Sequence, residues 1–289
     1  MFEQIISLTE TSCSLGLTSG FSIFSLEIRW YALSYIFGLI LGQIYLKNII
    51  KLNHYKGFIQ EKHIESFLLW AMIGIIIGGR LGYVVFYNFH YYITNPHMIF
   101  YVWQGGMSFH GGLIGIILVS FLYAKNNKIR FLALMDLICL AAPIGIFLGR
   151  ISNFLNGELW GRKSELPWSL VFKCAGPDSR HPSQIYEAFL EGLCIFVILY
   201  YCISKAKFLN KPGKIAGLFC ILYGMARIFV EFFREADPQY ISAENPNGYI
   251  FMISKDFGFS MGQTLSFPML IIGIFFIILS FKNIKKRIS

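Results

Sequence analysis

Polar side chains are concentrated in residues 149–162, directly after an apolar run that is long enough to cross a membrane. Two arginines, two asparagines and a glutamate fall within these fourteen residues. Polar groups at the end of such a run are costly to keep there and are typical of a functional site. If the helix continues past Arg150, then Arg150, Asn153, Gly157 and Gly161 share one hydrogen-bonding face. The alternative is an ordinary polar helix end, with a stop at Gly157 and arginines that extend to water.

A second polar stripe lies within the apolar run 215–233, where Tyr223, Arg227 and Glu231 recur at every fourth position. Residues with this spacing lie on one face of a helix. Arginine presents a planar fork of donors that keeps its charge and therefore suits a phosphate. Because the arginine precedes the glutamate, the pair is in its weaker order, and an arginine on another helix is an alternative partner for Glu231. A purely structural ion pair between Arg227 and Glu231 is the other interpretation.

The composition is that of an integral membrane protein. Of the 289 residues, 55% are hydrophobic and only 14% are charged, and the mean hydropathy is +0.57. The formal charge of +9 comes from lysines and arginines in short loops rather than from one basic patch, which argues against a nucleic-acid partner. The six cysteines show no CxxC or metal-ligand spacing. We therefore expect no disulfide framework, no metal site and no cofactor.

Seven apolar runs are near the length of a membrane-spanning helix. They are residues 30–46, 67–87, 107–124, 131–148, 186–204, 215–233 and 265–281. Glycine pairs interrupt several runs, but they also allow membrane helices to approach closely. The sequence therefore predicts an all-α, polytopic membrane protein with seven transmembrane helices. We treat residues 1–289 as a single integral membrane domain with external segments at about 150–185 and 234–264.

Basic residues lie in every second loop, which sets the expected orientation. Lysine and arginine are frequent between runs one and two, three and four, and five and six, and at the C-terminal tail. Residues 1–27 and 88–106 contain none. The positive-inside rule therefore places the N-terminus outside and the C-terminus in the cytoplasm. Five basic residues in 150–185 oppose the rule. Either some of them bind a ligand, or a longer loop is translocated despite its charge.

In this orientation, separate runs bring polar residues to a similar depth below the external face. Arg227 lies about thirteen residues beyond the cytoplasmic Lys214, or roughly 20 Å into a hydrocarbon core of roughly 30 Å. The full set is Tyr31, Arg80, His110, Arg150, Asn153, Tyr223, Arg227 and Glu231. We expect this cluster to be net positive and to lie at the level of the outer headgroups, where a phospholipid headgroup is a natural ligand.

These segments resemble the bacterial prolipoprotein diacylglyceryl transferase family over nearly the whole chain. The family signature Gly-Arg-x-x-Asn-Phe-x-Asn-Gly-Glu-x-x-Gly is intact from Gly149 to Gly161. Further blocks that resemble the family lie at residues 28–31, 78–83, 105–112, 181–187, 223–227 and 231–234. The resemblance implies a multi-pass enzyme of the bacterial inner (cytoplasmic) membrane. It would transfer the sn-1,2-diacylglyceryl group of phosphatidylglycerol to the lipobox cysteine of a prolipoprotein, forming a thioether and releasing glycerol-1-phosphate.

The resemblance also implies site residues and partners. The residues expected to be catalytic are Tyr31, His110, Arg150, Asn153, Glu158, Tyr223, Arg227 and Glu231. Those expected to bind phosphatidylglycerol are Arg80, Arg150, Asn153, Gly157, Gly161 and Arg227. The implied partners are phosphatidylglycerol, the prolipoprotein signal peptide with its lipobox, and membrane lipids. The nucleophile is the cysteine of the peptide, so the reaction needs stabilised leaving oxygens and a presented thiolate, but no metal.

The group that takes the thiol proton is left open. His110 suits a general base because imidazole titrates nearest neutral pH. Alternatively, Arg150 and Arg227 lower the pKa of the substrate thiol, and His110 orients the lipid or packs against glycine. Glu158 and Glu231 are expected to orient arginines or hydroxyls rather than to exchange protons.

Two other classes of membrane protein are alternatives. A lipid or anion transporter would need a matching polar path toward the cytoplasm, and none is visible in the sequence. A seven-helix receptor is supported only by the helix count and the external N-terminus.

Overall fold

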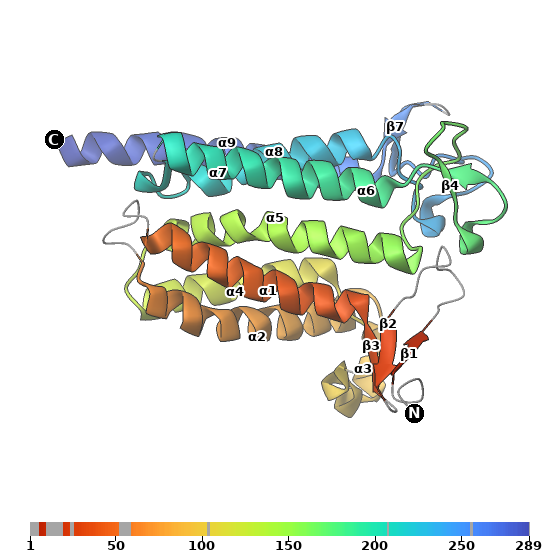
Figure 1. The fold of residues 1–289 in the computed structure, drawn as a ribbon, viewed down its shortest axis with the longest axis horizontal. Helices are drawn as coiled ribbons and strands as arrows, with labels where there is room; N and C mark the ends of the chain where they lie inside the picture. Colours follow the sequence, from red (N-terminus) through yellow and green to blue (C-terminus); the bar gives the residue numbers. More distant parts are fainter. Residues whose placement is uncertain are drawn as a thin grey trace. The chain divides into compact units, whose positions relative to one another are not determined.

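The computed structural model describes residues 6–9, 20–23, 26–51, 59–102, 105–206, 208–254 and 257–288. The chain forms two compact units (Figure 1). The larger unit consists of Met1–Ile44 and Ile138–Ser289, and the smaller unit of Tyr45–Leu137. The chain passes between the units within two helices, α1 (Trp30–Ile49) and α5 (Phe131–Asn156).

The smaller unit is built on α2 (Glu61–Phe86) and α4 (Phe109–Asn126), which pack along a stripe of glycines. A methyl group added at Gly82 would lie 2.6 Å from the Cα atom of Gly111, and one added at Gly78 would lie 2.8 Å from the Cα atom of Gly115. Both distances are too short for a side chain, so glycine allows the two helix backbones to touch. The connection between them contains α3 (Phe89–Thr94) and the 3-10 helix η2 (Pro96–Phe100).

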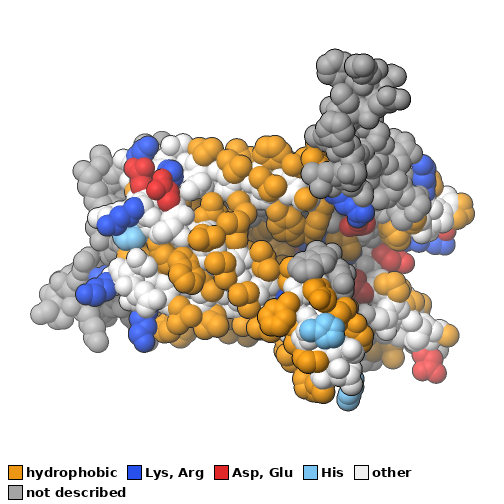
Figure 2. All heavy atoms as spheres, turned by 90° about the horizontal axis from the view of Figure 1, so that it is seen from below, with side chains coloured by type: hydrophobic (Ala, Val, Ile, Leu, Met, Phe, Trp, Pro, Cys, Tyr) orange, Lys and Arg blue, Asp and Glu red, His pale blue; other side chains and the backbone are white. Residues whose placement is uncertain are grey.

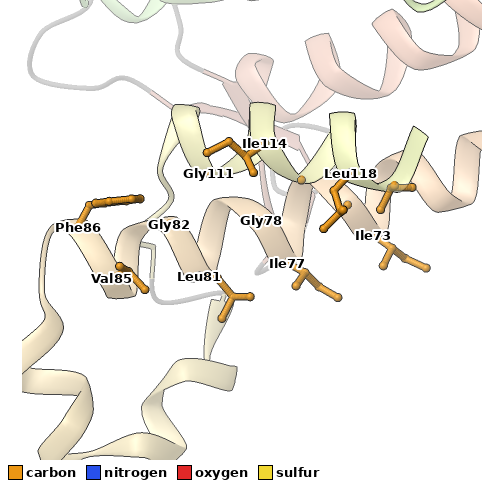
Figure 3. Close-up of a pocket in the computed structure, with 13 residues that line it drawn as sticks. Ile73, Ile77, Gly78, Leu81, Gly82, Val85, Phe86, Gly111, Ile114 and Leu118 are labelled. Atoms are coloured by element: carbon orange, nitrogen blue, oxygen red, sulfur yellow. The ribbon is translucent and has the colours of Figure 1, made fainter. Parts of the chain in front are cut away.

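The same helix pair leaves an open apolar groove of about 390 Å³. Figure 3 shows Ile77, Leu81 and Val85 of α2 along this groove, with Ile114 and Leu118 of α4. None of the residues that line it carries a charge, so the groove itself offers no ionic partner to a phosphate. An apolar surface of this kind is expected where a helix pair meets lipid tails.

The larger unit carries the other long helices. α6 (Ser183–Glu187) continues into α7 (Ile195–Ala206) through a π-helical segment, η5 (Ala188–Cys194). The 3-10 helix η6 (Phe208–Asn210) leads to α8 (Lys214–Val230), and α9 (Met261–Ile288) follows later. α8 and α9 pack closely, since a methyl group at Gly217 would lie 2.7 Å from the carbonyl oxygen of Gly273. π-helical segments are rare and often occur at functional sites.

Short strands lie outside the long helices. β1 (Ile6–Thr9), β2 (Gly20–Ile23) and β3 (Leu26–Arg29) form an antiparallel sheet before α1. β4 (Leu170–Val171) pairs with β5 (Ser179–Arg180), and β6 (Phe251–Met252) pairs with β7 (Gly258–Phe259). The 3-10 helix η4 (Lys173–Ala175) lies between β4 and β5, and the 3-10 helix η7 (Pro238–Tyr240) lies between α8 and β6. The all-α expectation therefore omitted three small sheets, because strands this short carry no clear periodicity.

Six helices within the described residues are long and apolar enough to cross a membrane. They are Trp30–Ile49, Glu61–Phe86, Phe109–Asn126, Phe131–Asn156, Ser183–Ser204 and Met261–Phe281. The remaining predicted run is also helical, as the 17-residue α8. Figure 2 shows hydrophobic side chains over the flanks of the helices and charged side chains near their ends. Large hydrophobic side chains such as Leu69, Ile77 and Phe275 are exposed. The expectation of a polytopic helical membrane protein is therefore confirmed.

One cysteine departs from the sequence-based expectation. Cys174, in η4, is disulfide-bonded. Among the described residues, the cysteines that are not disulfide-bonded are Cys139, Cys194, Cys202 and Cys220, and Cys13 lies outside the described residues. The expectation that the sequence holds no disulfide framework overlooked this bond, because a single bridge leaves no local spacing pattern.

Candidate active site

Three arginines and three glutamates of the larger unit form a set of ion pairs that we call the arginine–glutamate network. Its members are Arg150 on α5, Glu187 at the end of α6, Glu191 in η5, Arg227 on α8, and Glu231 and Arg234 directly after α8. Three segments that are far apart in the sequence thus bring their charged side chains together.

Glu187 contacts all three arginines. Its Oε1 atom accepts a hydrogen bond from Nη1 of Arg227 and lies 3.6 Å from Nη1 of Arg234. Its Oε2 atom lies 3.1 Å from Nε of Arg150. The side chain of Glu187 is 0% exposed. A buried carboxylate is stable only with opposite charges and donors close by, so these pairs hold α5, α6 and α8 together at this point.

Glu191 is held more loosely than Glu187. Its Oε2 atom lies 3.6 Å from Nη2 of Arg150, and its Oε1 atom lies 3.6 Å from Nη1 of Arg227. The side chain is 0% exposed. Among the described residues, neither carboxylate oxygen has a hydrogen-bond partner. Glu191 is therefore the carboxylate of the network with the weakest direct stabilisation.

The formal charges of the network cancel, because three arginines meet three glutamates. The sequence led us to expect a net positive cluster, since Glu187 and Glu191 were not among its members. Their spacing is the signal that could have found them. Glu187 and Glu191 are four residues apart in an apolar run, as are Arg227 and Glu231.

The arginines of the network still have donors available for an anion. Within the described part of the chain, Nη1 of Arg150 and Nε of Arg227 have neither an ion-pair nor a hydrogen-bond partner. The two side chains are 19% and 12% exposed, respectively. Two partly accessible guanidinium groups with unused N–H donors suit an anionic group such as a phosphate.

Glu231, the residue that directly follows α8, pairs with the arginine one turn earlier on that helix. Its Oε2 atom lies 3.0 Å from Nη2 of Arg227, four residues earlier, and its Oε1 atom accepts a hydrogen bond of 3.0 Å from Oγ of Ser260. A methyl group at Gly262 would lie 2.6 Å from Cδ of Glu231, so the start of α9 packs directly on this carboxylate. The sequence left two partners open for Glu231, namely Arg227 and an arginine on another helix. The structure shows the pair with Arg227.

The polar stretch after α5 is a helix end. α5 stops at Asn156, and the buried Gly157 has a φ of +66°, the left-handed conformation with which helices commonly end. The carboxylate of Glu158 accepts hydrogen bonds from Nδ2 of Asn153 at 3.4 Å and from Nδ2 of Asn156 at 3.3 Å. The expectation that Gly161 lies on the same helical face is wrong, because the helix ends before it.

Gly161 lies where the segment after α5 meets the segment after α8. Its N–H donates to the carbonyl oxygen of His181 at 2.9 Å. A methyl group at Gly161 would lie 2.5 Å from the carbonyl oxygen of Phe233 and 2.7 Å from that of His181. Glycine is therefore needed at Gly161 for packing.

The Nδ1 atom of His181 lies 3.2 Å from the hydroxyl of Tyr186. Burial lowers the pKa of His181, so its imidazole is mostly neutral near neutral pH.

Two tyrosines of the expected site also belong to the larger unit. Tyr31, at the start of α1, is 39% exposed, and its hydroxyl forms a 2.8 Å hydrogen bond with that of Tyr35. Tyr223 lies on α8, one turn before Arg227. The hydroxyl of Ser152 donates to the carbonyl oxygen of Trp30 at 3.3 Å, which ties the start of α1 to the polar end of α5.

Arg80, in the smaller unit, is occupied by backbone groups. Its five N–H bonds, the full complement of an arginine, all donate to carbonyl oxygens at 2.5 to 3.2 Å. The acceptors are Met98, Ile99, Tyr101, Gly105 and Gly106. The side chain is 4% exposed and lies 5.2 Å from the centre of the Tyr92 ring. Contact with a lipid phosphate would require one of these bonds to break.

His110 lies in the first turn of α4, also in the smaller unit, and its side chain is exposed. Ser108 fixes this turn: its hydroxyl accepts from the N–H of Gly111 at 3.2 Å, and its own N–H donates to the carbonyl oxygen of Gly79 at 2.9 Å. Because His110 and Arg80 belong to a different unit from the network, their convergence with it stays a prediction.

The fold and the site together define a polytopic membrane protein with paired arginines and glutamates buried among its helices, and such intramembrane charges typically have a function. Within the described ranges, no group of three or more His, Cys, Asp or Glu side chains could hold a metal ion. Residues 19–279 match the family Prolipoprotein diacylglyceryl transferase. The chain belongs to this family.

Curated relatives cover most of the chain. A protein of Roseobacter denitrificans is 45% identical over 267 residues, which are 88% of this chain and 90% of the relative. One of Rhodopseudomonas palustris is 46% identical over 261 residues, or 89% and 87% of the two chains. One of Rickettsia bellii is 44% identical over 258 residues, or 89% and 93%. Each is named phosphatidylglycerol--prolipoprotein diacylglyceryl transferase.

Proposed function

We propose that this protein transfers the sn-1,2-diacylglyceryl group of phosphatidylglycerol to the lipobox cysteine of prolipoproteins, the first step of lipoprotein maturation. The observation that carries the proposal is the buried arginine–glutamate network, in which Arg150 and Arg227 keep unused donors for a phosphate. The names of the relatives supply the two substrates. The family signature, which includes Arg150, connects the site to these relatives.

The chemistry needs little beyond positioning and charge. The cysteine sulfur of the peptide forms a bond to the terminal glycerol carbon of the diacylglyceryl group, and the bond from that carbon to the phosphate oxygen breaks. The phosphate leaves as part of glycerol-1-phosphate. Arg150 and Arg227 stabilise the charge that develops on the leaving oxygens, and fixed donors of this kind supply a large part of catalysis. Asn153 and Glu158, hydrogen-bonded to each other at the end of α5, orient the glycerol hydroxyls of the lipid.

Incubation of the purified protein with phosphatidylglycerol and a lipobox peptide tests the proposed function. We expect a thioether-linked diacylglyceryl peptide and an equal amount of glycerol-1-phosphate. A peptide with serine in place of the lipobox cysteine should give neither product. Phosphatidylethanolamine should be a poor donor, because it presents a cationic headgroup to the arginines. Lipid binding without peptide modification would contradict the transferase and favour a lipid-transport role.

We propose that His110 takes the proton of the substrate thiol or orients the lipid, and its pH profile distinguishes the two roles. His110→Gln and His110→Asn can form hydrogen bonds but cannot serve as a base. If His110 is the base, transfer by these variants should recover as the pH rises through the pKa of the free thiol, about 8.5. An equal deficit at every pH would assign it to lipid positioning. Wild-type rates throughout would exclude it from the site.

We propose seven membrane spans in the inner membrane, with the N-terminus outside. Counting α8 as the seventh span keeps the basic loops between runs one and two, three and four, and five and six, and the basic C-terminal tail, on the cytoplasmic side. The disulfide at Cys174 supports an external position for residues 150–185, because disulfides persist in oxidising compartments. Reporter fusions should therefore be active in the periplasm after Asn95 and in the cytoplasm after Lys128. The reverse pattern would contradict both the orientation and the predicted depth of the site.

A further inference from the structure

The charge balance of the arginine–glutamate network has to change when a lipid binds. Three arginines and three glutamates cancel in the protein alone. The phosphodiester of phosphatidylglycerol adds one negative charge at any physiological pH. An uncompensated charge in a buried site is costly and is commonly avoided by a change of protonation. One proton taken up with the lipid would restore neutrality.

The three carboxylates differ in how well they could accept this proton. Glu187 contacts three arginines and accepts a hydrogen bond from Arg227. Glu231 pairs with Arg227 at 3.0 Å and accepts a hydrogen bond from Ser260. Donors to a carboxylate favour its charged form. Both of these glutamates therefore have closer donors than Glu191 has.

Glu191 is the exception. It is fully buried, its nearest cationic atoms are 3.6 Å away, and neither oxygen has a hydrogen-bond partner among the described residues. The same two arginines, Arg150 and Arg227, carry the unused donors toward which a phosphate would be drawn. A phosphate on these donors would compete directly with Glu191 for positive charge.

The groups around Glu191 come from every neighbouring segment of the network. They are Arg150 from α5, Tyr223 and Arg227 from α8, Arg234 after α8, and Glu187 one turn earlier on its own helix. No histidine is among them. A lipid phosphate that shares Arg150 and Arg227 leaves Glu191 with less positive charge beside Tyr223 and Glu187, and with Arg234 as its remaining cation, which favours the neutral acid.

We propose that Glu191 takes up one proton when an anionic phosphodiester lipid binds to Arg150 and Arg227, so that lipid binding is coupled to protonation. This inference rests on the proposed function, which supplies phosphatidylglycerol as the ligand. It makes Glu191 a positioning residue that acts through the arginines. Linkage fixes the sign: a proton bound together with the lipid makes lipid affinity fall by up to tenfold for each pH unit of increase.

Calorimetry on the full-length protein in detergent tests the coupling. Dihexanoyl phosphatidylglycerol is titrated without peptide in two buffers of different ionisation enthalpy, and the difference in heat gives the protons taken up per lipid bound. Dihexanoyl phosphatidylcholine corrects for the heat of detergent mixing. We expect close to one proton in the wild type above neutral pH and none in Glu191→Gln. Glu191→Asp, which keeps the carboxylate, should keep the uptake.

The outcomes separate this inference from the proposed function. No saturable binding of phosphatidylglycerol would contradict the function itself. Saturable binding without proton uptake would overturn the proton coupling alone. Uptake that persists in Glu191→Gln would place the proton on another group and also overturn the proposal. If Glu191→Gln does not fold, infrared difference spectra of the wild type decide, because lipid binding must then produce the band of a protonated carboxyl group.

Discussion

Arg227→Lys is expected to lower the rate of diacylglyceryl transfer by about 10²- to 10³-fold, the usual cost of removing one fixed donor to a developing anion. Arg227 holds Glu187 and Glu231 with its two Nη atoms and has Nε left for a phosphate. Lysine keeps the charge but has one compact donor group, so it cannot keep both carboxylates and also bind the lipid. The measurement is the transfer rate with phosphatidylglycerol and a lipobox peptide at saturating concentrations.

Two comparisons make this result specific. Lys214→Arg, at the other end of α8 and outside the network, should retain near-normal transfer. Arg150→Lys should resemble Arg227→Lys, because Arg150 also has an unused donor next to Glu187. Thermal unfolding of each variant in detergent checks that the fold survives. Near-normal transfer by folded Arg227→Lys would reduce Arg227 to a structural cation.

Glu187→Ala is expected to destabilise the protein by about 3–5 kcal/mol, the range for breaking a buried ion pair from one side. Its removal leaves Arg150, Arg227 and Arg234 without the carboxylate that they share. Equilibrium unfolding by denaturant in detergent measures the effect. The exposed Glu165 gives a matched control, because Glu165→Ala should change the free energy of unfolding by no more than about 0.5 kcal/mol. Equal stability of the two variants would show that the network does not hold α5, α6 and α8 together.

The site could be predicted from the sequence where local motifs were specific. The stretch from Gly149 to Gly161 and the Tyr223, Arg227 and Glu231 stripe both pointed to intramembrane charge. The balance of that charge could not be predicted, because which carboxylate meets which arginine depends on how distant segments pack. The contacts of Arg80 could not be predicted either. Its five acceptors are backbone carbonyl oxygens, which every residue type provides, so the sequence does not mark them.

Helix positions followed from hydrophobic runs more reliably than helix ends did. α2 begins at Glu61 rather than at residue 67, because its first turns carry polar side chains that the search for apolar runs leaves out. The π-helical segment η5 has no sequence signature, yet Glu191 lies in it. The strands before α1 and in the segments after α5 and α8 are two to four residues long, too short for an alternating pattern to stand out.

The five hydrogen bonds of Arg80 constrain the order in which the smaller unit can assemble during biogenesis. When α2 first enters the bilayer alone, this guanidinium has no carbonyl partners and must draw water or lipid headgroups toward itself. Its partners all lie in residues 98–106, which become part of the chain only after α2 is complete. The insertion of α2 is therefore finished only when this connection folds back onto it, which also brings α4 to the glycine stripe of α2.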